Sequence, residues 1–128
     1  VGCSKNIINI RISNKNIYGT EMYKVINVSN RIENGEEKEV KVLFENTKAK
    51  IAQLTLRKNK TLAGHKANVP IIIQCIAGIG ELIIDNGIEM KKLSLAPGTI
   101  IALEANVHHS IVAKPSVSLL LLKSGNAV

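Results

Sequence analysis

The sequence predicts an all-β domain, either a sandwich or a barrel. From residue 22 onward, apolar and polar residues alternate with a period of two, which is typical of half-buried strands. Turn residues separate these stretches at short, regular intervals, and no stretch has the 3.6-residue period of an amphipathic helix. With 128 residues, 45% of them hydrophobic, the chain is long enough to bury the core of one domain.

Eight short strands are expected in this domain. They are predicted at residues 39–44, 49–56, 69–77, 81–84, 88–93, 99–103, 110–113 and 117–123. Tight turns are expected at Gly78-Ile79-Gly80 and, in the type I′ form, at Asp85-Asn86-Gly87. We predict a polar loop at 57–61, and we expect Pro115 to separate the last two strands.

The domain is expected to span residues 22–128, because an ordinary domain start is recognisable at Met22. Residues 1–21 are interpreted as an N-terminal extension. The alternation from Ile7 to Ile12 could add an edge strand to the domain.

The net charge of +7 is interpreted as a solvated basic surface. Lysine supplies 14 of the 17 basic residues, spread along the chain, whereas phosphate-binding proteins usually cluster arginine. Only Tyr18, Tyr23 and Phe44 are aromatic, so few rings could stack on bases. Nucleic acid is therefore not an expected partner.

A cytoplasmic, membrane-free setting is expected. Cys3 and Cys75 do not form a disulfide framework, and Cys75 lies in an apolar run typical of a core strand. No signal peptide is recognisable, and the longest apolar stretch, residues 69–84, is too short and too polar to span a bilayer.

Two apolar runs do not alternate: residues 71–73 and 119–122. A strand that is apolar on both faces needs cover on both faces. The opposite sheet covers one face, and a partner subunit is expected to cover the other, which predicts a homodimer. The alternative is cover by residues 1–30 of the same chain.

The chain has three histidines, His65, His108 and His109, and each is expected where a turn meets a strand. In a barrel built from hairpins, two such positions can lie at the same rim. A histidine near a strand end is more often a hydrogen-bonded surface residue than a ligand. The spacing of the residues around each histidine is therefore needed to identify a ligand.

Residues 49–123 resemble the cupins, whose first motif is G-x5-H-x-H-x3–4-E-x6-G. In this chain the motif positions are occupied by Asn59, His65, Ala67, Ile71 and Gly78. The resemblance implies a cupin-type jelly-roll β-barrel, also called a double-stranded β-helix.

The second cupin motif is G-x5-P-x-G-x2-H-x3-N. Its positions are occupied here by Gly98, Glu104, Asn106, His109 and Ala113. Asparagine replaces glycine once in each motif, a mild change because asparagine tolerates the left-handed conformation.

The resemblance implies that His65 and His109 are metal ligands. In the family, two histidines and a glutamate of the first motif and one histidine of the second hold a metal. Ala67 and Ile71 replace two of these ligands. We therefore expect either a weakly held divalent transition metal (Fe, Mn, Ni or Zn) or none. A third ligand is not identified, and Gln74 is a poor candidate because strand alternation points it to the other face.

A small ligand pocket is the other expectation for the barrel. Parity from Ile71 and His109 points several apolar side chains inward, and the two imidazoles stand at one end. The candidate lining residues are His108, Gln53, Ile71, Ile73, Cys75 and Ile111. The alternative is an interior filled by its own side chains.

We therefore expect a small cupin-like protein that binds a small ligand or a weakly held metal, with its catalytic residues unknown. One alternative is a metal-dependent dioxygenase or isomerase. The other is a non-catalytic structural or regulatory module.

Overall fold

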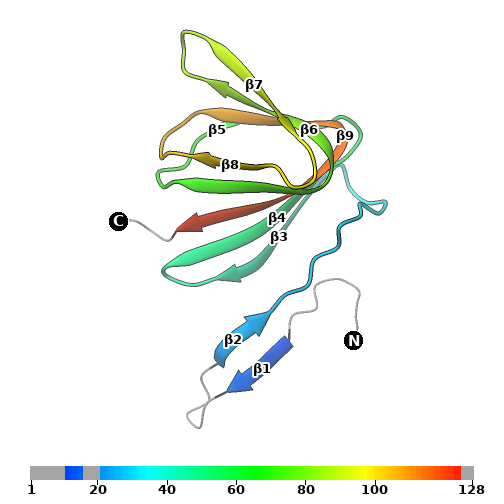
Figure 1. Ribbon diagram of the computed structural model, residues 1–128, viewed down its shortest axis with the longest axis vertical. Coiled ribbons are helices and arrows are strands. Elements are labelled where there is room, and N and C mark those ends of the chain that lie inside the picture. Colours follow the sequence, from blue (N-terminus) through cyan, green and yellow to red (C-terminus); the bar gives the residue numbers. More distant parts are fainter. Residues whose placement is uncertain (1–10, 16–20, 125–128) are drawn as a thin grey trace. The chain divides into compact units, whose positions relative to one another are not determined.

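The computed structural model describes residues 11–15 and 21–124, and in these segments all regular structure is β-strand (Figure 1). No helix in these segments is long and apolar enough to cross a membrane. The chain divides into two compact units, residues 1–30 and residues 31–128.

The first unit contains two antiparallel strands, β1 (Arg11–Lys15) and β2 (Glu21–Val25). Their register runs from Arg11 opposite Val25 to Lys15 opposite Glu21. Most of the edge strand predicted at 7–12 lies outside the described residues, as do Cys3 and Tyr18.

The second unit is a seven-stranded antiparallel sheet that folds over on itself (Figure 1). Two long strands, β6 and β9, form its spine, because the first half of each pairs with the second half of the other. The strands are β3 (Lys38–Glu45), β4 (Ala49–Leu56), β5 (Thr61–His65), β6 (Ile71–Asp85), β7 (Met90–Leu95), β8 (Ile100–Leu103) and β9 (His109–Ser124).

The spine divides the strands into two layers. One layer has the order β3-β4-β9-β6-β8, and the other has β5-β9-β6-β7. The predicted hairpin of β3 and β4 is confirmed. Hydrogen bonding does not close the layers into a continuous barrel, because β7 and β8 pair only with β6.

The predicted turn at Gly78-Ile79-Gly80 is wrong. Strand β6 continues through these residues, and its register with β9 shifts there, so they form a bend between the two layers. Gly78 has a φ of +77°, and a Cβ at this position would collide with the carbonyl oxygen of Ser116. Glycine is needed here for a close backbone approach rather than for a chain reversal.

The predicted break at Pro115 is also wrong, because β9 runs from His109 to Ser124 without interruption. Pro115 lies beside the bend of β6, where both β6 and β9 pass from one layer to the other. Its carbonyl oxygen accepts a hydrogen bond from the backbone N–H of Asn59. Proline is tolerated where the strand ladder is already irregular.

The hairpin of β6 and β7 is confirmed, but its turn is not type I′. The connection is longer than two residues, and Gly87 (φ +89°) has a positive φ whereas Asn86 does not. The Asn86 side-chain oxygen accepts hydrogen bonds from the N–H groups of Ile88 and Glu89, both at 2.9 Å. The side chain thus stabilises a wider loop.

The core lies between the two layers and is almost entirely aliphatic. Cys75 is fully buried in it, as predicted, and burial raises the pKa of its thiol. The other core residues are Leu54, Leu56, Ile71, Ile73, Leu82, Leu95, Leu103, Ile111, Ala113, Val117 and Leu119.

Candidate functional site

Strand pairing brings His65 and His109 together. His65 ends β5, His109 begins β9, and the two residues are direct partners in the antiparallel register. Strand β5 was not predicted. Its only described pairing is with β9, which is far away in the sequence and gives no local signal.

The two imidazole rings are in contact. Their centroids lie 4.6 Å apart and the ring planes are inclined by 70°. His109 is 2% exposed, whereas His65 is exposed to solvent. The pair thus has one ring anchored in the protein and one ring open to solvent.

Backbone carbonyls orient both rings. The Nδ1 atom of His109 donates a hydrogen bond to the carbonyl oxygen of Val107 at 3.0 Å, and Nδ1 of His65 makes a longer, weaker contact of 3.4 Å with that of Ala63. A carbonyl oxygen can only accept, so the His109 contact places the proton of that ring on Nδ1, and the same tautomer satisfies the weaker contact of His65. The lone pair of each ring is then on Nε2, the form in which histidine binds metals.

Although its side chain reaches solvent, His65 is partly desolvated, and this lowers its pKa most; the positive potential of His109, Lys123, His108 and Lys38 lowers it further. Both effects disfavour the imidazolium. The ring is therefore neutral at pH 7 and able to donate its lone pair.

His108 lies outside the pair. Its side chain is exposed, and its ring packs against Gly64, where any Cβ would collide with Cε1. The cupin ligand positions at 67 and 71 hold aliphatic side chains, both packed in or against the core. Within residues 11–15 and 21–124, no three His, Cys, Asp or Glu side chains form a group that could hold a metal ion.

Four of the residues nominated for a ligand pocket lie together. Ile71, Ile73, Cys75 and Ile111 are at most 6% exposed and pack in one core cluster. Gln53 lies on the opposite face of its strand, where its side-chain Nε2 donates a hydrogen bond to the Ser118 hydroxyl at 3.0 Å.

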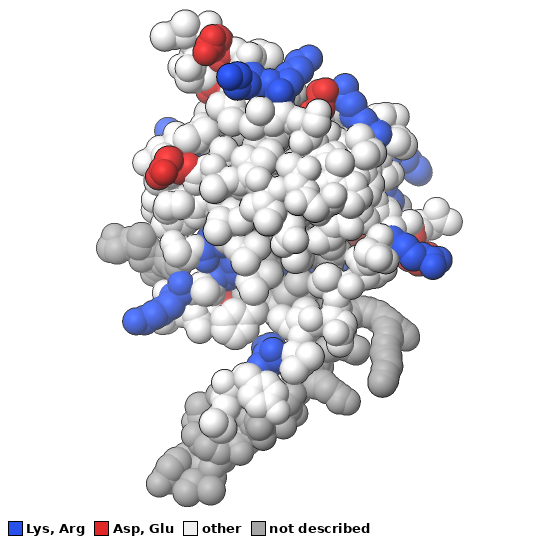
Figure 2. Space-filling model, in the orientation of Figure 1, with Lys and Arg blue, Asp and Glu red and all other residues white. Residues whose placement is uncertain are grey.

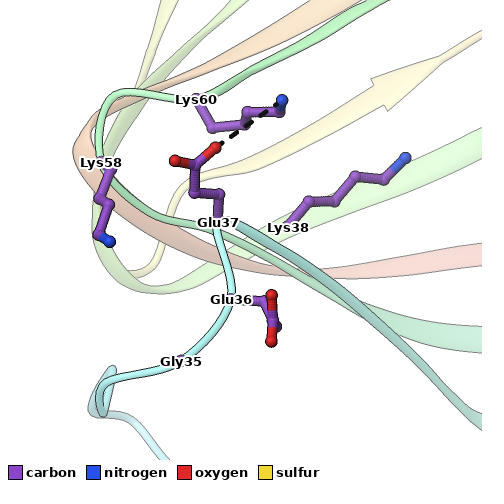
Figure 3. A pocket seen from close by; sticks show the side chains of 6 residues that line it. All are labelled: Gly35, Glu36, Glu37, Lys38, Lys58 and Lys60. Atoms are coloured by element: carbon purple, nitrogen blue, oxygen red, sulfur yellow. Dashed lines mark ion pairs between the residues drawn. The ribbon is translucent and has the colours of Figure 1, made fainter.

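A surface pocket of about 460 Å³ lies between the segment before β3 and the β4–β5 loop, which belongs to the polar loop predicted at residues 57–61. Lys60 turns toward Glu37, with 4.0 Å between the ammonium and a carboxylate oxygen, whereas Lys38 and Lys58 extend in other directions (Figure 3). The pocket therefore has mixed charge and no convergent set of donors.

The glycine positions of the two cupin motifs all have left-handed backbones. The φ angles are +58° at Asn59, +77° at Gly78, +97° at Gly98 and +67° at Asn106. The expectation that asparagine can replace glycine at 59 and 106 is thereby confirmed. Each of these four positions lies at a turn or at the bend of β6.

Several solved structures have a similar fold. A cupin superfamily protein from Desulfitobacterium hafniense is 16% identical over 74% of this chain and 84% of its own, with a TM-score of 0.66. The fold is a cupin-type jelly roll. An RmlC-like cupin protein from Desulfovibrio desulfuricans is 17% identical over 77% of this chain and 95% of its own, with a TM-score of 0.63.

KdgF from a Halomonas species also has the cupin-type arrangement, with 16% identity over 73% of this chain and 84% of its own and a TM-score of 0.62. No protein-family model and no curated protein matches the sequence. At these identities the likeness concerns the fold alone.

Proposed function

We propose that this cupin-fold protein binds a divalent transition metal ion weakly through His65 and His109, and that the ion's open positions take a small ligand. The contact between the two rings, 4.6 Å between centroids, is the observation that carries the proposal. With metal–nitrogen bonds of about 2.1 Å, rings this close can reach one ion.

The donor chemistry supports a transition metal. Two imidazoles whose Nδ1 atoms are directed at backbone carbonyls offer Nε2 lone pairs, which suit Zn, Ni, Fe and Mn in different degrees. Nickel and zinc should bind more tightly than manganese and iron, following the usual order for divalent ions.

The proposed binding is weak because only two protein ligands contribute. Ile71 is buried in the core and Ala67 packs against it, so neither position offers a donor atom. A catalytic metal site normally keeps three protein ligands and one open position. We therefore propose ligand binding rather than a defined reaction. The bound ion would supply a Lewis-acidic centre for an oxygen or nitrogen donor.

The buried ring and the exposed ring have different roles in this proposal. His109 is held by Val107 and by the core, and provides a fixed donor. His65 is accessible and completes the pair from the solvent side. Because His109 is buried, its side of the pair would be shielded from water.

Calorimetric titration of the untagged protein with Zn²⁺ and Ni²⁺ tests this proposal. One ion should bind per chain, and His65→Ala should weaken binding at least about tenfold, since half of the protein ligands are lost. His108→Ala is the matched control, because it removes the neighbouring exposed imidazole and leaves the pair intact.

Circular dichroism should show the same fold for all three proteins. Equal affinities of wild type and His65→Ala would contradict the proposal, as would the absence of binding at millimolar metal.

A further inference from the structure

The row of residues that contains the two histidines projects from the core-facing side of its layer. His109 lies beside His65 on one side and Ile84 of β6 on the other, and Ile84 lies beside Lys91 of β7. His109 is buried, and Ile84 packs against the core. Direct partners on neighbouring strands project from the same face of a sheet, so this row ends in a lysine on the core-facing side.

The other layer ends in a row with two lysines. Lys123 of β9 lies between Ile71 of β6 and Lys50 of β4. Ile71 is buried in the core, so both lysines also project from the core-facing side. Each row lies where the pairing of β6 with β9 is farthest from the bend, and Figure 1 shows these strand ends of both layers on the left.

The charge on this side is not balanced. Glu45 is the only acidic residue on the core-facing side of the described strands β3 to β9, and its carboxylate lies 4.0 Å from the ammonium of Lys50. Lys123 is partly buried, and no carboxylate of a described residue lies within 4.0 Å of its ammonium. Lys123 therefore keeps a positive charge that no described acidic residue compensates.

The two rows belong to one site. The positive charge of Lys123 is among the causes that lower the pKa of His65 on the other layer, and no acidic residue is among them. On the face seen in Figure 2, lysine and arginine side chains lie around the margin of an uncharged expanse. The positive charge visible on this face thus lies at its edges, where a ligand could approach the strand ends.

We propose that the small ligand of the His65–His109 site is an organic monocarboxylate, and that Lys123 binds its carboxylate group. This inference rests on the proposed function, because the same carboxylate would fill an open position of the metal ion. A lysine ammonium offers three N–H donors, and its charge-assisted hydrogen bonds to carboxylates are stronger than those between neutral groups.

The kinds of basic residue favour a carboxylate over a phosphate. Glu45 already lies beside Lys50, so a singly charged group suffices to balance Lys123. Phosphate recognition commonly uses arginine, whose planar guanidinium forms two parallel hydrogen bonds, and strands β3 to β9 contain no arginine.

Chemical-shift titration of the ¹⁵N-labelled, zinc-loaded protein with butyrate and with its neutral analogue butyramide tests the inference. Butyrate should bind at least about tenfold more tightly, because only butyrate is charged. Lys123→Gln should weaken the binding of butyrate about tenfold, the loss expected for a hydrogen bond between charged groups, and should leave that of butyramide unchanged.

Lys41→Gln is the matched control. It removes the same charge from a strand, but Lys41 is exposed and lies beside Gln53, on the face away from the core. Circular dichroism should show the wild-type fold for both variants. If Lys123→Gln does not fold, Lys123→Met, which keeps an aliphatic side chain, takes its place.

The same titration of the metal-free protein separates this inference from the proposed metal site. Butyrate should bind more weakly there, with the same dependence on Lys123. If zinc does not bind but this dependence persists, the metal proposal fails and the carboxylate site stands.

Three results would overturn the inference while the metal site stands. Equal affinities of the zinc-loaded protein for butyrate and butyramide would remove the preference for a carboxylate. Equal affinities of Lys123→Gln and Lys41→Gln for butyrate would place the anion elsewhere. Tighter binding of inorganic phosphate than of butyrate would assign the site to phosphates.

Discussion

The two faces of strand β6 show how differently the same residue type can be used. Ile73 points into the core and is 1% exposed, whereas its neighbour Ile72 points outward and is 45% exposed. In the sequence both belong to one apolar run, and nothing local separates them. An apolar run therefore predicts burial only for the face that the fold itself covers. The other face remains available to a partner.

Truncating each of the two isoleucines should reveal the largest difference in stability between the two faces. Ile73→Ala should lower the free energy of unfolding by about 2–5 kcal/mol, since it leaves a cavity in the core. Ile72→Ala should lower it by less than about 1 kcal/mol in dilute protein, because no cavity forms. Urea denaturation of both variants at the same low concentration measures the difference. Equal losses would show that both faces are core.

Two glycines permit a second comparison, between a crowded bend and an open one. Gly78 (φ +77°) abuts the carbonyl oxygen of Ser116, whereas Gly87 (φ +89°) has open space where a Cβ would project. Gly87→Ala should cost about 1–2 kcal/mol for the left-handed backbone alone. Gly78→Ala should cost about 1–3 kcal/mol more, because neighbouring atoms must move.

Thermal or urea unfolding of the two alanine variants compares these costs. A Gly78→Ala protein as stable as Gly87→Ala would mean that the bend of β6 can relax, and that the layers do not depend on this close approach.

The smallest expected effect concerns pH and the exposed histidine. The folded-state pKa of His65 is lowered by burial and by neighbouring positive charge, so the unfolded chain takes up this proton more readily. Its contribution to stability is therefore highest above the unfolded pKa of about 6.5 and falls as the pH drops through the two pKa values.

Replacing His65 by glutamine isolates this effect. In metal-free protein, the stability of wild type relative to His65→Gln should decrease from pH 7.5 to pH 5, as measured by urea unfolding at each pH. A difference that stays constant or grows toward acid pH would contradict the lowered pKa.

The strand pattern and the motif positions were largely predictable from sequence, because both depend on local chemistry. Alternation predicted the hairpin of β3 and β4, and asparagine at 59 and 106 occupies the left-handed positions expected of it. Cys75 is buried as its apolar neighbourhood indicated.

The features that were missed depend on distant partners. Gly78 carries the same local signal whether the chain reverses or bends within a strand, and only its contact with Ser116 decides. Strand β5 forms because β9 pairs with it. The orientation of Gln53, away from the core, follows from the register of β4 with β9 and could not be read from its spacing.

Nitrogen NMR of the imidazoles tests the claim that His65 and His109 form one metal-binding pair. Long-range ¹H–¹⁵N spectra of the uniformly ¹⁵N-labelled, metal-free protein should show both rings protonated on Nδ1, because each Nδ1 faces a carbonyl oxygen. On addition of Zn²⁺, the Nε2 signals of His65 and His109 should shift together while His108 stays unchanged. Protonation on Nε2 in both rings, or a zinc-induced shift confined to His108, would contradict the claim.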